Sequence, residues 1–211
     1  MPAQQPDATY VSGLLSRQEA LQAEAQSVIE ELDLTRTLAR VGEVQQVGSS
    51  VTGLMVWRDL DFTVMAPGLS QQEAFNVVLP LISDGRMVKV EYANELGERS
   101  PTRLPEDQRH YFVLHFLAAE GREWKIDITM WYTNAPRTQL AHIEYIKSRL
   151  TDETRTAILW LKDVWHRLPI YPYQVGGMEV YDAVLEHGVR TPAEFDTYLR
   201  ERGLPGRFSC E

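Results

Sequence analysis

Residues 47–62 read VGSSVTGLMVWRDLDF, and most of what the sequence predicts about fold and chemistry follows from this stretch. The residues before Gly48 fit a short strand over 44–47, and alternating polarity predicts a second strand over 55–65. Side chains alternate faces along a strand, so Asp59 and Asp61 project together to one side. Two carboxylates on one face repel each other unless a cation lies between them, and hard oxygen ligands of this kind suit Mg²⁺ or Mn²⁺.

Gly48 and Ser49 add a second chemical feature to this stretch. A glycine and a serine directly after a strand can turn backbone N–H groups and a hydroxyl toward an anion. A phosphate site beside a pair of carboxylates is the combination that metal-assisted phosphoryl or nucleotidyl transfer requires.

Asp127 is a candidate for a third carboxylate in the same site. Residues 110–117 and 123–131 are two β-rich runs separated by Ala-Ala-Glu-Gly-Arg, which predicts a hairpin with a glycine-containing turn. In the second run, Lys125, Asp127 and Thr129 share one face and apolar residues share the other. If this strand lies beside 55–65, Asp127 completes a site of three carboxylates able to hold two ions ~3.5–4 Å apart.

The remaining pattern predicts an α+β fold in two parts. A small mixed β-sheet flanked by helices is expected over 1–136, and an α-helical domain that closes the active-site cleft over 137–211. Ser16 and Glu19 predict a capping box that begins the first helix, after poorly ordered residues 1–15. The other expected elements are helices at 34–40, 70–83, 137–149, 152–167, 177–187 and 192–202, a strand at 87–92 and a polar loop at 94–108.

The Gly-Ser pair, nine intervening residues and Asp-Leu-Asp-Phe resemble the signature of the polymerase-β-like nucleotidyltransferase superfamily. The resemblance covers about residues 40–135. It extends more loosely to Leu-Trp-Leu-Lys at 159–162 and Gly-Gly-Met at 176–178, which are similar to the helical domain of poly(A)-polymerase-like and oligoadenylate-synthase-like members. Gly177 stands where a serine is common in those relatives.

The resemblance implies a role for each candidate site residue. A nucleoside triphosphate would bind with its β- and γ-phosphates near Gly48 and Ser49, and Lys162 would contact the triphosphate. Mg²⁺ or Mn²⁺ would be held by the three catalytic carboxylates, and one of these would also deprotonate or orient the acceptor hydroxyl. The metal ligands are Asp59 and Asp61 together with Asp127, and Asp127 is the one expected to act on the hydroxyl.

Composition bears on the acceptor and the compartment. The 211 residues include 21 basic and 30 acidic ones, a formal net charge of −9, and the basic residues form no continuous stripe. Such a chain is poorly suited to gripping a long polynucleotide, which predicts a small acceptor. Cys210 is the single cysteine, which excludes an internal disulfide framework and fits the cytoplasm. No apolar run is long enough to predict a membrane span, and the five histidines lack metal-ligand spacing.

The sequence therefore predicts an enzyme that transfers a nucleoside monophosphate from an NTP, with ATP as a candidate, to a hydroxyl of a small acceptor and releases pyrophosphate. One alternative is a catalytically silent nucleotide-binding or antitoxin-like module of the same fold. Another is an enzyme that acts on RNA or on a second nucleotide. Members that lose catalysis usually lose one acid, and this chain keeps all three, which favours an enzyme.

Overall fold

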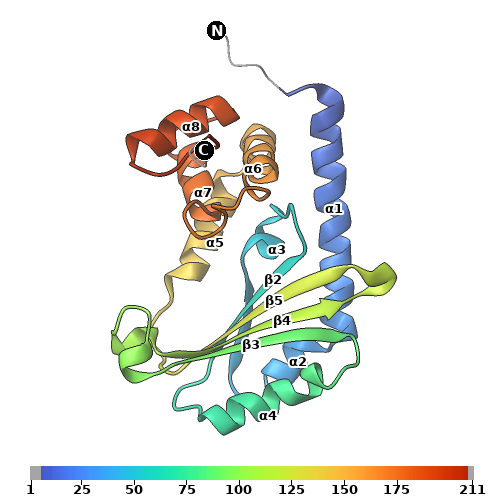
Figure 1. The fold of residues 1–211 in the computed structure, drawn as a ribbon, viewed down its shortest axis with the longest axis vertical. Coiled ribbons are helices and arrows are strands. Elements are labelled where there is room, and N and C mark those ends of the chain that lie inside the picture. The colour runs from blue at the N-terminus through green and yellow to red at the C-terminus, as the bar shows by residue number, and fades with distance from the viewer. Residues whose placement is uncertain (1–5, 209–211) are drawn as a thin grey trace. The chain divides into compact units, whose positions relative to one another are not determined.

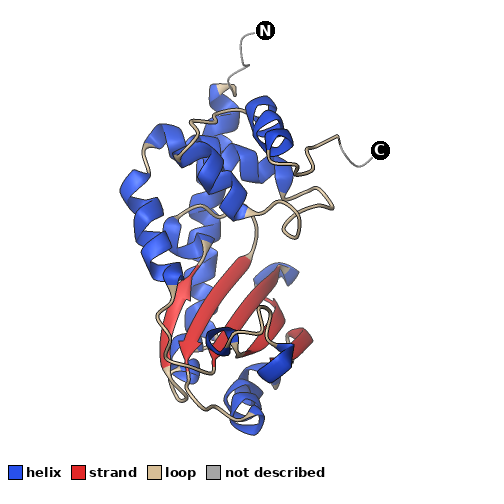
Figure 2. Ribbon diagram, turned by 90° about the vertical axis from the view of Figure 1, so that its left-hand side faces the viewer, coloured by secondary structure: helices blue, strands red, loops and turns tan. Residues whose placement is uncertain are grey.

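The computed structural model describes residues 6–208 and divides into two compact units. One unit comprises 22–53 and 57–143 and contains the β-sheet; the described residues of the other are 6–21, 54–56 and 144–208, and it is helical (Figures 1 and 2). These units are called the sheet unit and the helical unit below. Their limits differ from the expected cut after residue 136, because the first half of the N-terminal helix packs with the C-terminal helices.

The sheet unit is built on five strands in the order β1-β2-β5-β4-β3. Strands β2 and β5 are parallel, and every other neighbouring pair is antiparallel. The expected mixed sheet is confirmed, and so is the hairpin, which is formed by β4 and β5. The strands are β1 (Glu43–Val47), β2 (Asp59–Met65), β3 (Met87–Glu95), β4 (Arg109–Leu117) and β5 (Glu123–Trp131).

The two faces of the sheet differ in polarity. The apolar face carries buried residues such as Leu60, Phe112 and Ile126, and these alternate along the strands with polar residues that face the other way. Helices α2 (Leu34–Leu38) and α4 (Gln71–Ile82) lie on one side of the sheet in Figure 1. The opposite face is where the charged residues of β2 and β5 project.

Helix α4 has the expected capping box: the Glu73 backbone N–H donates to Ser70 Oγ (3.2 Å), and the Ser70 N–H donates to Glu73 Oε2 (2.9 Å). Helix α3 (Ser49–Thr52) is a single turn that ends at Gly53. Short 3₁₀ turns are present at Gly97–Arg99, Pro105–Asp107 and Ala119–Gly121.

Three expected boundaries are wrong. Strand β3 ends at Glu95 and not at 92, because the hydrogen-bonded pairing with β4 continues to Glu95 opposite Arg109. Helix α1 runs over Ala8–Glu31, so Ser16 lies inside the helix and does not begin it. Residues 8–15 are helical because this turn has tertiary partners, including Leu14, which is buried in the core of the helical unit; residues 1–5 lie outside the described part. Strand β2 begins at Asp59 and not at residue 55, because residues 54–56 are buried in the helical unit instead of pairing with the sheet.

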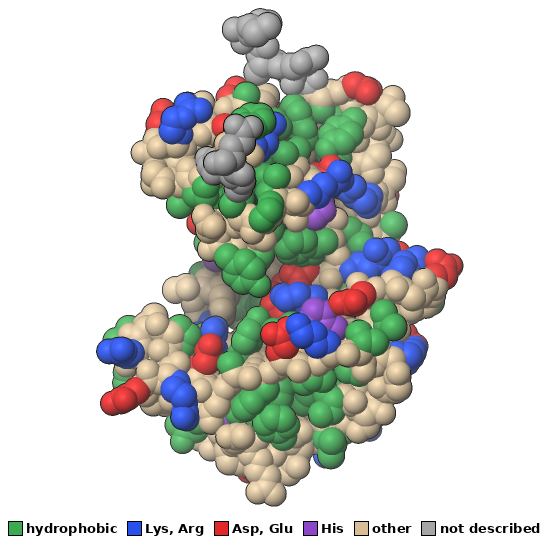
Figure 3. All heavy atoms as spheres, viewed as in Figure 1, with side chains coloured by type: hydrophobic (Ala, Val, Ile, Leu, Met, Phe, Trp, Pro, Cys, Tyr) green, Lys and Arg blue, Asp and Glu red, His purple; other side chains and the backbone are tan. Residues whose placement is uncertain are grey.

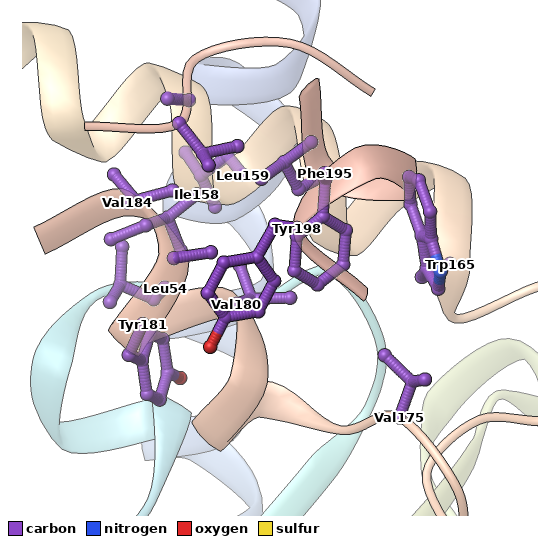
Figure 4. Packing of buried hydrophobic residues seen from close by; sticks show 14 of the residues in the cluster. Leu54, Ile158, Leu159, Trp165, Val175, Val180, Tyr181, Val184, Phe195 and Tyr198 are labelled. Carbon is purple, nitrogen blue, oxygen red and sulfur yellow. The ribbon is translucent and has the colours of Figure 1, made fainter. Parts of the chain in front are cut away.

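The helical unit has one apolar core, shown in Figure 4, with Leu54, Ile158, Trp165 and Phe195 among its buried members. The four helices described after Pro136 confirm the helical pattern expected there, and the first of them begins within the sheet unit. They are α5 (Thr138–Arg149), α6 (Asp152–Trp165), α7 (Gly177–Leu185) and α8 (Pro192–Glu201). Within residues 6–208, none of the helices combines the length and apolarity needed to cross a bilayer.

Candidate active site

The parallel pairing of β2 with β5 brings together the three carboxylates that the sequence singled out. In this register Asp61 lies opposite Asp127, and Asp59 lies opposite Lys125. Residues opposite each other in neighbouring strands project from the same face, so all three acids share the polar face of the sheet. The side chains of Asp59 and Asp127 are only 15% and 17% exposed, respectively, so they are largely shielded from solvent.

Lys125 lies between two of these acids. Its Nζ is 2.7 Å from Asp127 Oδ2 and 3.4 Å from Asp59 Oδ1. Burial lowers the pKa of Lys125, but the neighbouring carboxylates outweigh burial, and the pKa ends above its usual value. The side chain is therefore a permanent ammonium at neutral pH.

Burial has a different effect on Asp59. It raises the pKa of this carboxyl, Lys125 opposes the rise, and the charge of Asp127 adds to it. Burial and the charge of Asp127 thus make ionisation of Asp59 costly. A bound cation in addition to Lys125 would reduce this cost. Asp127 Oδ1 points to the same conclusion, because it is a buried acceptor with no hydrogen-bond partner among the described residues.

Gly48 lies directly against the Asp61 carboxylate. Its φ of +75° is in the left-handed region, and a Cβ added to it would lie 2.1 Å from Asp61 Oδ2. Glycine is required here both by backbone conformation and by space. The backbone of the Gly-Ser turn therefore lies beside one of the acids, as the sequence predicted for a phosphate site.

Ser50 anchors this turn by hydrogen bonds that were not apparent in the sequence. Its hydroxyl accepts from Gln46 Nε2 (2.9 Å) and donates to the Val47 carbonyl (3.3 Å), while its own carbonyl accepts from Gln22 Nε2 (2.5 Å). Ser49, the predicted phosphate contact, begins α3 and is 9% exposed. The turn is thus supported by α1 and β1.

Tyr111 of β4 is a neighbour of the acids that sequence reasoning missed. It pairs with Thr129 in the antiparallel register of β4 and β5. Burial raises the pKa of Tyr111, and the negative charge of Asp127 raises it further. The phenol therefore stays protonated beside the carboxylates. The predicted hairpin could have identified Tyr111, because the length of its turn sets which β4 residue lies opposite Thr129.

Lys162 belongs to the helical unit and is only 4% exposed. Its ammonium donates to the Leu54 carbonyl (2.7 Å) and lies 3.4 Å from the Tyr181 hydroxyl. The structure thus gives Lys162 a structural hydrogen bond, and its contact with a triphosphate stays a prediction.

The donor set can be compared with the needs of a divalent ion. Within residues 6–208, no three His, Cys, Asp or Glu side chains are arranged as a metal-binding group, and Lys125 separates two of the three acids. Carboxylate oxygens are nevertheless the ligands that Mg²⁺ prefers, and Asp127 Oδ1 is a buried acceptor in need of a partner. The residues therefore fit a hard divalent ion, which Asp59, Asp61 and Asp127 would hold.

Comparison with known proteins bears on the fold. No family model matches the chain, and no curated protein matches it significantly. A solved structure of a cytoplasmic RNA terminal U-transferase is 19% identical, with a TM-score of 0.50 over 78% of this chain and 45% of that one.

Two structures of the Cid1 poly(U) polymerase are each 16% identical to this chain. The MgGTP-bound structure gives a TM-score of 0.55 over 84% of this chain and 55% of the polymerase. The other gives 0.54 over 80% of this chain and 49% of the polymerase. The chain thus spans about half the length of these proteins. At these identities the likeness is one of fold, and the expected resemblance is confirmed at that level: this chain has the fold of the polymerase-β-like nucleotidyltransferases.

Proposed function

We propose that this protein is a metal-dependent nucleotidyltransferase that moves a nucleoside monophosphate from an NTP to an acceptor hydroxyl. The observation that carries the proposal is the register of β2 with β5, which puts Asp59, Asp61 and Asp127 on one face beside the backbone of Gly48. The fold shared with terminal uridylyltransferases supports it.

Each residue has a role that follows from its chemistry. The backbone of Gly48 and Ser49 would bind the β- and γ-phosphates, and the three acids would hold Mg²⁺ or Mn²⁺. A bound divalent ion would neutralise the triphosphate and the leaving pyrophosphate. Asp127 would accept the proton of the acceptor hydroxyl while the hydroxyl oxygen forms its bond to the α-phosphorus. The bond from the α-phosphorus to the bridging oxygen then breaks, and pyrophosphate leaves.

A small molecule is the acceptor we favour. The formal net charge is −9, and the structure places acids beside many of the basic residues, as in the pairs Arg58–Glu24 and Arg109–Glu95. RNA is the second candidate, supported by the likeness to an RNA terminal U-transferase. ATP as the nucleotide and a cytoplasmic location stay predictions.

Incubation with each of the four NTPs, Mg²⁺ and a metabolite extract, followed by mass spectrometry, tests the proposed function. We expect an NMP-modified product and pyrophosphate, with turnover reduced by orders of magnitude in Asp61→Asn, which keeps the shape of the side chain but removes a charged ligand. Mg²⁺ together with an NTP should also raise the melting temperature more than either alone, by mass action on the folded state.

The outcomes separate the candidate functions. Stabilisation by Mg²⁺ and an NTP without any product, in the extract or with added RNA, would indicate the silent nucleotide-binding module. A melting temperature that no NTP and no metal changes would rule out both the enzyme and the module.

A further inference from the structure

Lys125 already provides a cation inside the acidic cluster. It comes from the same strand as Asp127, two positions earlier, and alternation puts both side chains on one face. The register with β2 sets it opposite Asp59. The result is one ammonium held at 2.7 Å from Asp127 Oδ2 and 3.4 Å from Asp59 Oδ1, on acids that are 17% and 15% exposed.

This arrangement differs from an ordinary surface pair on the same sheet. Lys89 and Glu91 of the edge strand β3 also form an ion pair, and Lys89 is 59% exposed against 41% for Lys125, but the carboxylate of Glu91 is 51% exposed, far more than that of Asp59 or Asp127. Figure 3 shows that charged side chains of both signs are intermixed on the side of the molecule that it draws. Exposed pairs contribute little, whereas Lys125 contacts two shielded acids at once. Lys89 is therefore a suitable control residue.

The contacts of Asp127 show how a lysine in this place would serve the reaction. Lys125 engages Oδ2, and Oδ1 is the buried oxygen that has no partner within the described residues. The ammonium thus fixes the carboxylate by one oxygen and leaves the other for a donor. That donor would be the acceptor hydroxyl in the proposed function.

Lys125 occupies the place between two acids where a second divalent ion would lie. Before a nucleotide binds, three carboxylates and one ammonium leave two negative charges, which one divalent ion balances. An ion placed between Asp59 and Asp127 would have to displace Lys125 from both. Mg²⁺ is commonly held by one or two carboxylates together with substrate phosphates, and Asp61 with Asp59 provides such a pair.

We propose that Lys125 takes the place of one of the two metal ions expected at this site, so that the protein binds a single divalent ion with the triphosphate. This inference rests on the proposed function. Lys125 is a positioning residue in it, since it acts through Asp59 and Asp127. In this arrangement Asp59 and Asp61 hold the single ion, and Asp127, which the proposed function counts among the metal ligands, pairs with Lys125 and acts on the acceptor hydroxyl.

Binding stoichiometry tests this without any turnover. Mn²⁺ is titrated into the full chain with a saturating non-hydrolysable NTP analogue, and bound Mn²⁺ is counted by electron paramagnetic resonance. Because the analogue itself binds Mn²⁺, a titration without protein is subtracted. We expect one ion per chain for the wild type, for Lys89→Gln and for Lys125→Arg, which keeps the positive charge.

In Lys125→Gln we expect a second ion. Removing a unit positive charge about 4 Å away should strengthen its binding by about tenfold or more. Mn²⁺ should also raise the melting temperature of Lys125→Gln more than that of the wild type, because its acids lack their internal cation. If this variant does not fold, the stoichiometries of the wild type and Lys125→Arg still decide.

The proposal and the function on which it rests fail in different ways. Two ions of similar affinity in the wild type, or one ion in a folded Lys125→Gln, would overturn the role of Lys125 and leave the nucleotidyltransferase intact. No binding of the analogue to the wild type, with or without Mn²⁺, would overturn the proposed function as well.

Discussion

Gly48 shows how one residue can couple backbone conformation to the chemistry of a site. Its φ of +75° lets the chain turn sharply between β1 and α3, and its missing side chain leaves room for the Asp61 carboxylate. Gly68 has the same φ of +75°, but a Cβ added there would meet no atom within 4 Å. Gly48 differs from Gly68 in crowding, and its ψ of −159° also completes a backbone conformation that is essentially restricted to glycine.

Gly48→Ala should be much more damaging than Gly68→Ala. The left-handed conformation alone costs a non-glycine residue about 1–2 kcal/mol, and Gly68→Ala should lose about that much free energy of unfolding. Gly48→Ala should lose more, because alanine rarely adopts this φ and ψ and its Cβ would lie 2.1 Å from Asp61 Oδ2, and it should also weaken NTP binding. Urea denaturation and calorimetric titration with an NTP analogue measure both effects. Equal losses in the two variants would show that Asp61 does not crowd this position.

Helix α6 carries two adjacent buried charged residues with different partners. Lys162 donates to the buried Leu54 carbonyl, and Asp163 accepts from Tyr10 Oη (2.6 Å) and Arg167 Nη2 (2.7 Å) and pairs with Arg17. Within the helical unit, Lys162 thus holds the segment that contains Leu54, and Asp163 holds the first half of α1. A single helix thus organises the N-terminal helix and the segment that follows α3.

Lys162→Met should lower the free energy of unfolding by about 1–3 kcal/mol, because the buried Leu54 carbonyl would lose its donor. Lys147→Met, on the exposed part of α5, should change it little. Calorimetry with an NTP analogue then tests the contact implied by the family resemblance. Weaker binding in Lys162→Met alone would support that contact, and unchanged binding would limit Lys162 to its structural role.

Asp163 makes the helical unit sensitive to acid. Burial raises the pKa of Asp163, but hydrogen bonds from Tyr10 and Arg17 outweigh it, and the pKa lies below its usual value. Burial and Asp163 raise the pKa of Tyr10 to about 12, so the phenol stays a donor. A carboxyl with a lowered pKa stabilises the folded state above its unfolded pKa of about 3.9 and loses that contribution as the pH falls further.

Asp163→Asn should therefore be less stable than the wild type at pH 7 by about 1–3 kcal/mol. The difference should shrink as the pH falls below about 4, because the unfolded carboxyl is protonated there, and the remainder should be lost as the pH falls through the lower pKa of the folded carboxyl. Denaturation curves between pH 7 and pH 3 measure this, with the exposed Asp152→Asn as control. A difference that does not change with pH would mean that the charge of Asp163 does not stabilise the fold.

At the scale of the whole molecule, charge bears on the acceptor. Each phosphate that a protein neutralises makes affinity fall with log salt by a slope of about −0.7 to −0.9. Many basic side chains here pair with acids, for example Arg58 with Glu24 and Arg207 with Asp196. Few are then left to neutralise successive phosphates.

We expect weak binding to a ~20-nucleotide RNA or DNA, with no submicromolar affinity at 200 mM salt. Fluorescence anisotropy at 50 and 200 mM salt checks this. Submicromolar affinity at the higher salt, with a steep dependence between the two conditions, would make RNA the preferred acceptor.

Local patterns in the sequence predicted much of the fold and the core of the candidate site. Two β-rich runs around a glycine-containing turn predicted β4 and β5, and Ser70 with Glu73 predicted the start of α4, because these signals depend on residues a few positions apart. The start of α1 was wrong, since residues 8–15 are held by partners such as Asp163, far along the chain. The start of β2 was wrong for the same reason: the segment before it is buried in the helical unit.

The site divides in the same way. The acids Asp59, Asp61 and Asp127 were recognisable from residue type, spacing and face alone. The ammonium of Lys125 between two of them, the contact of Gly48 with Asp61 and the proximity of Tyr111 required strand order and register. Lys125 and Asp59 are 66 residues apart in the chain, and no local periodicity encodes that distance. Side-chain alternation is a property of each strand, whereas the partner of a side chain is set by which strands pair and in what register.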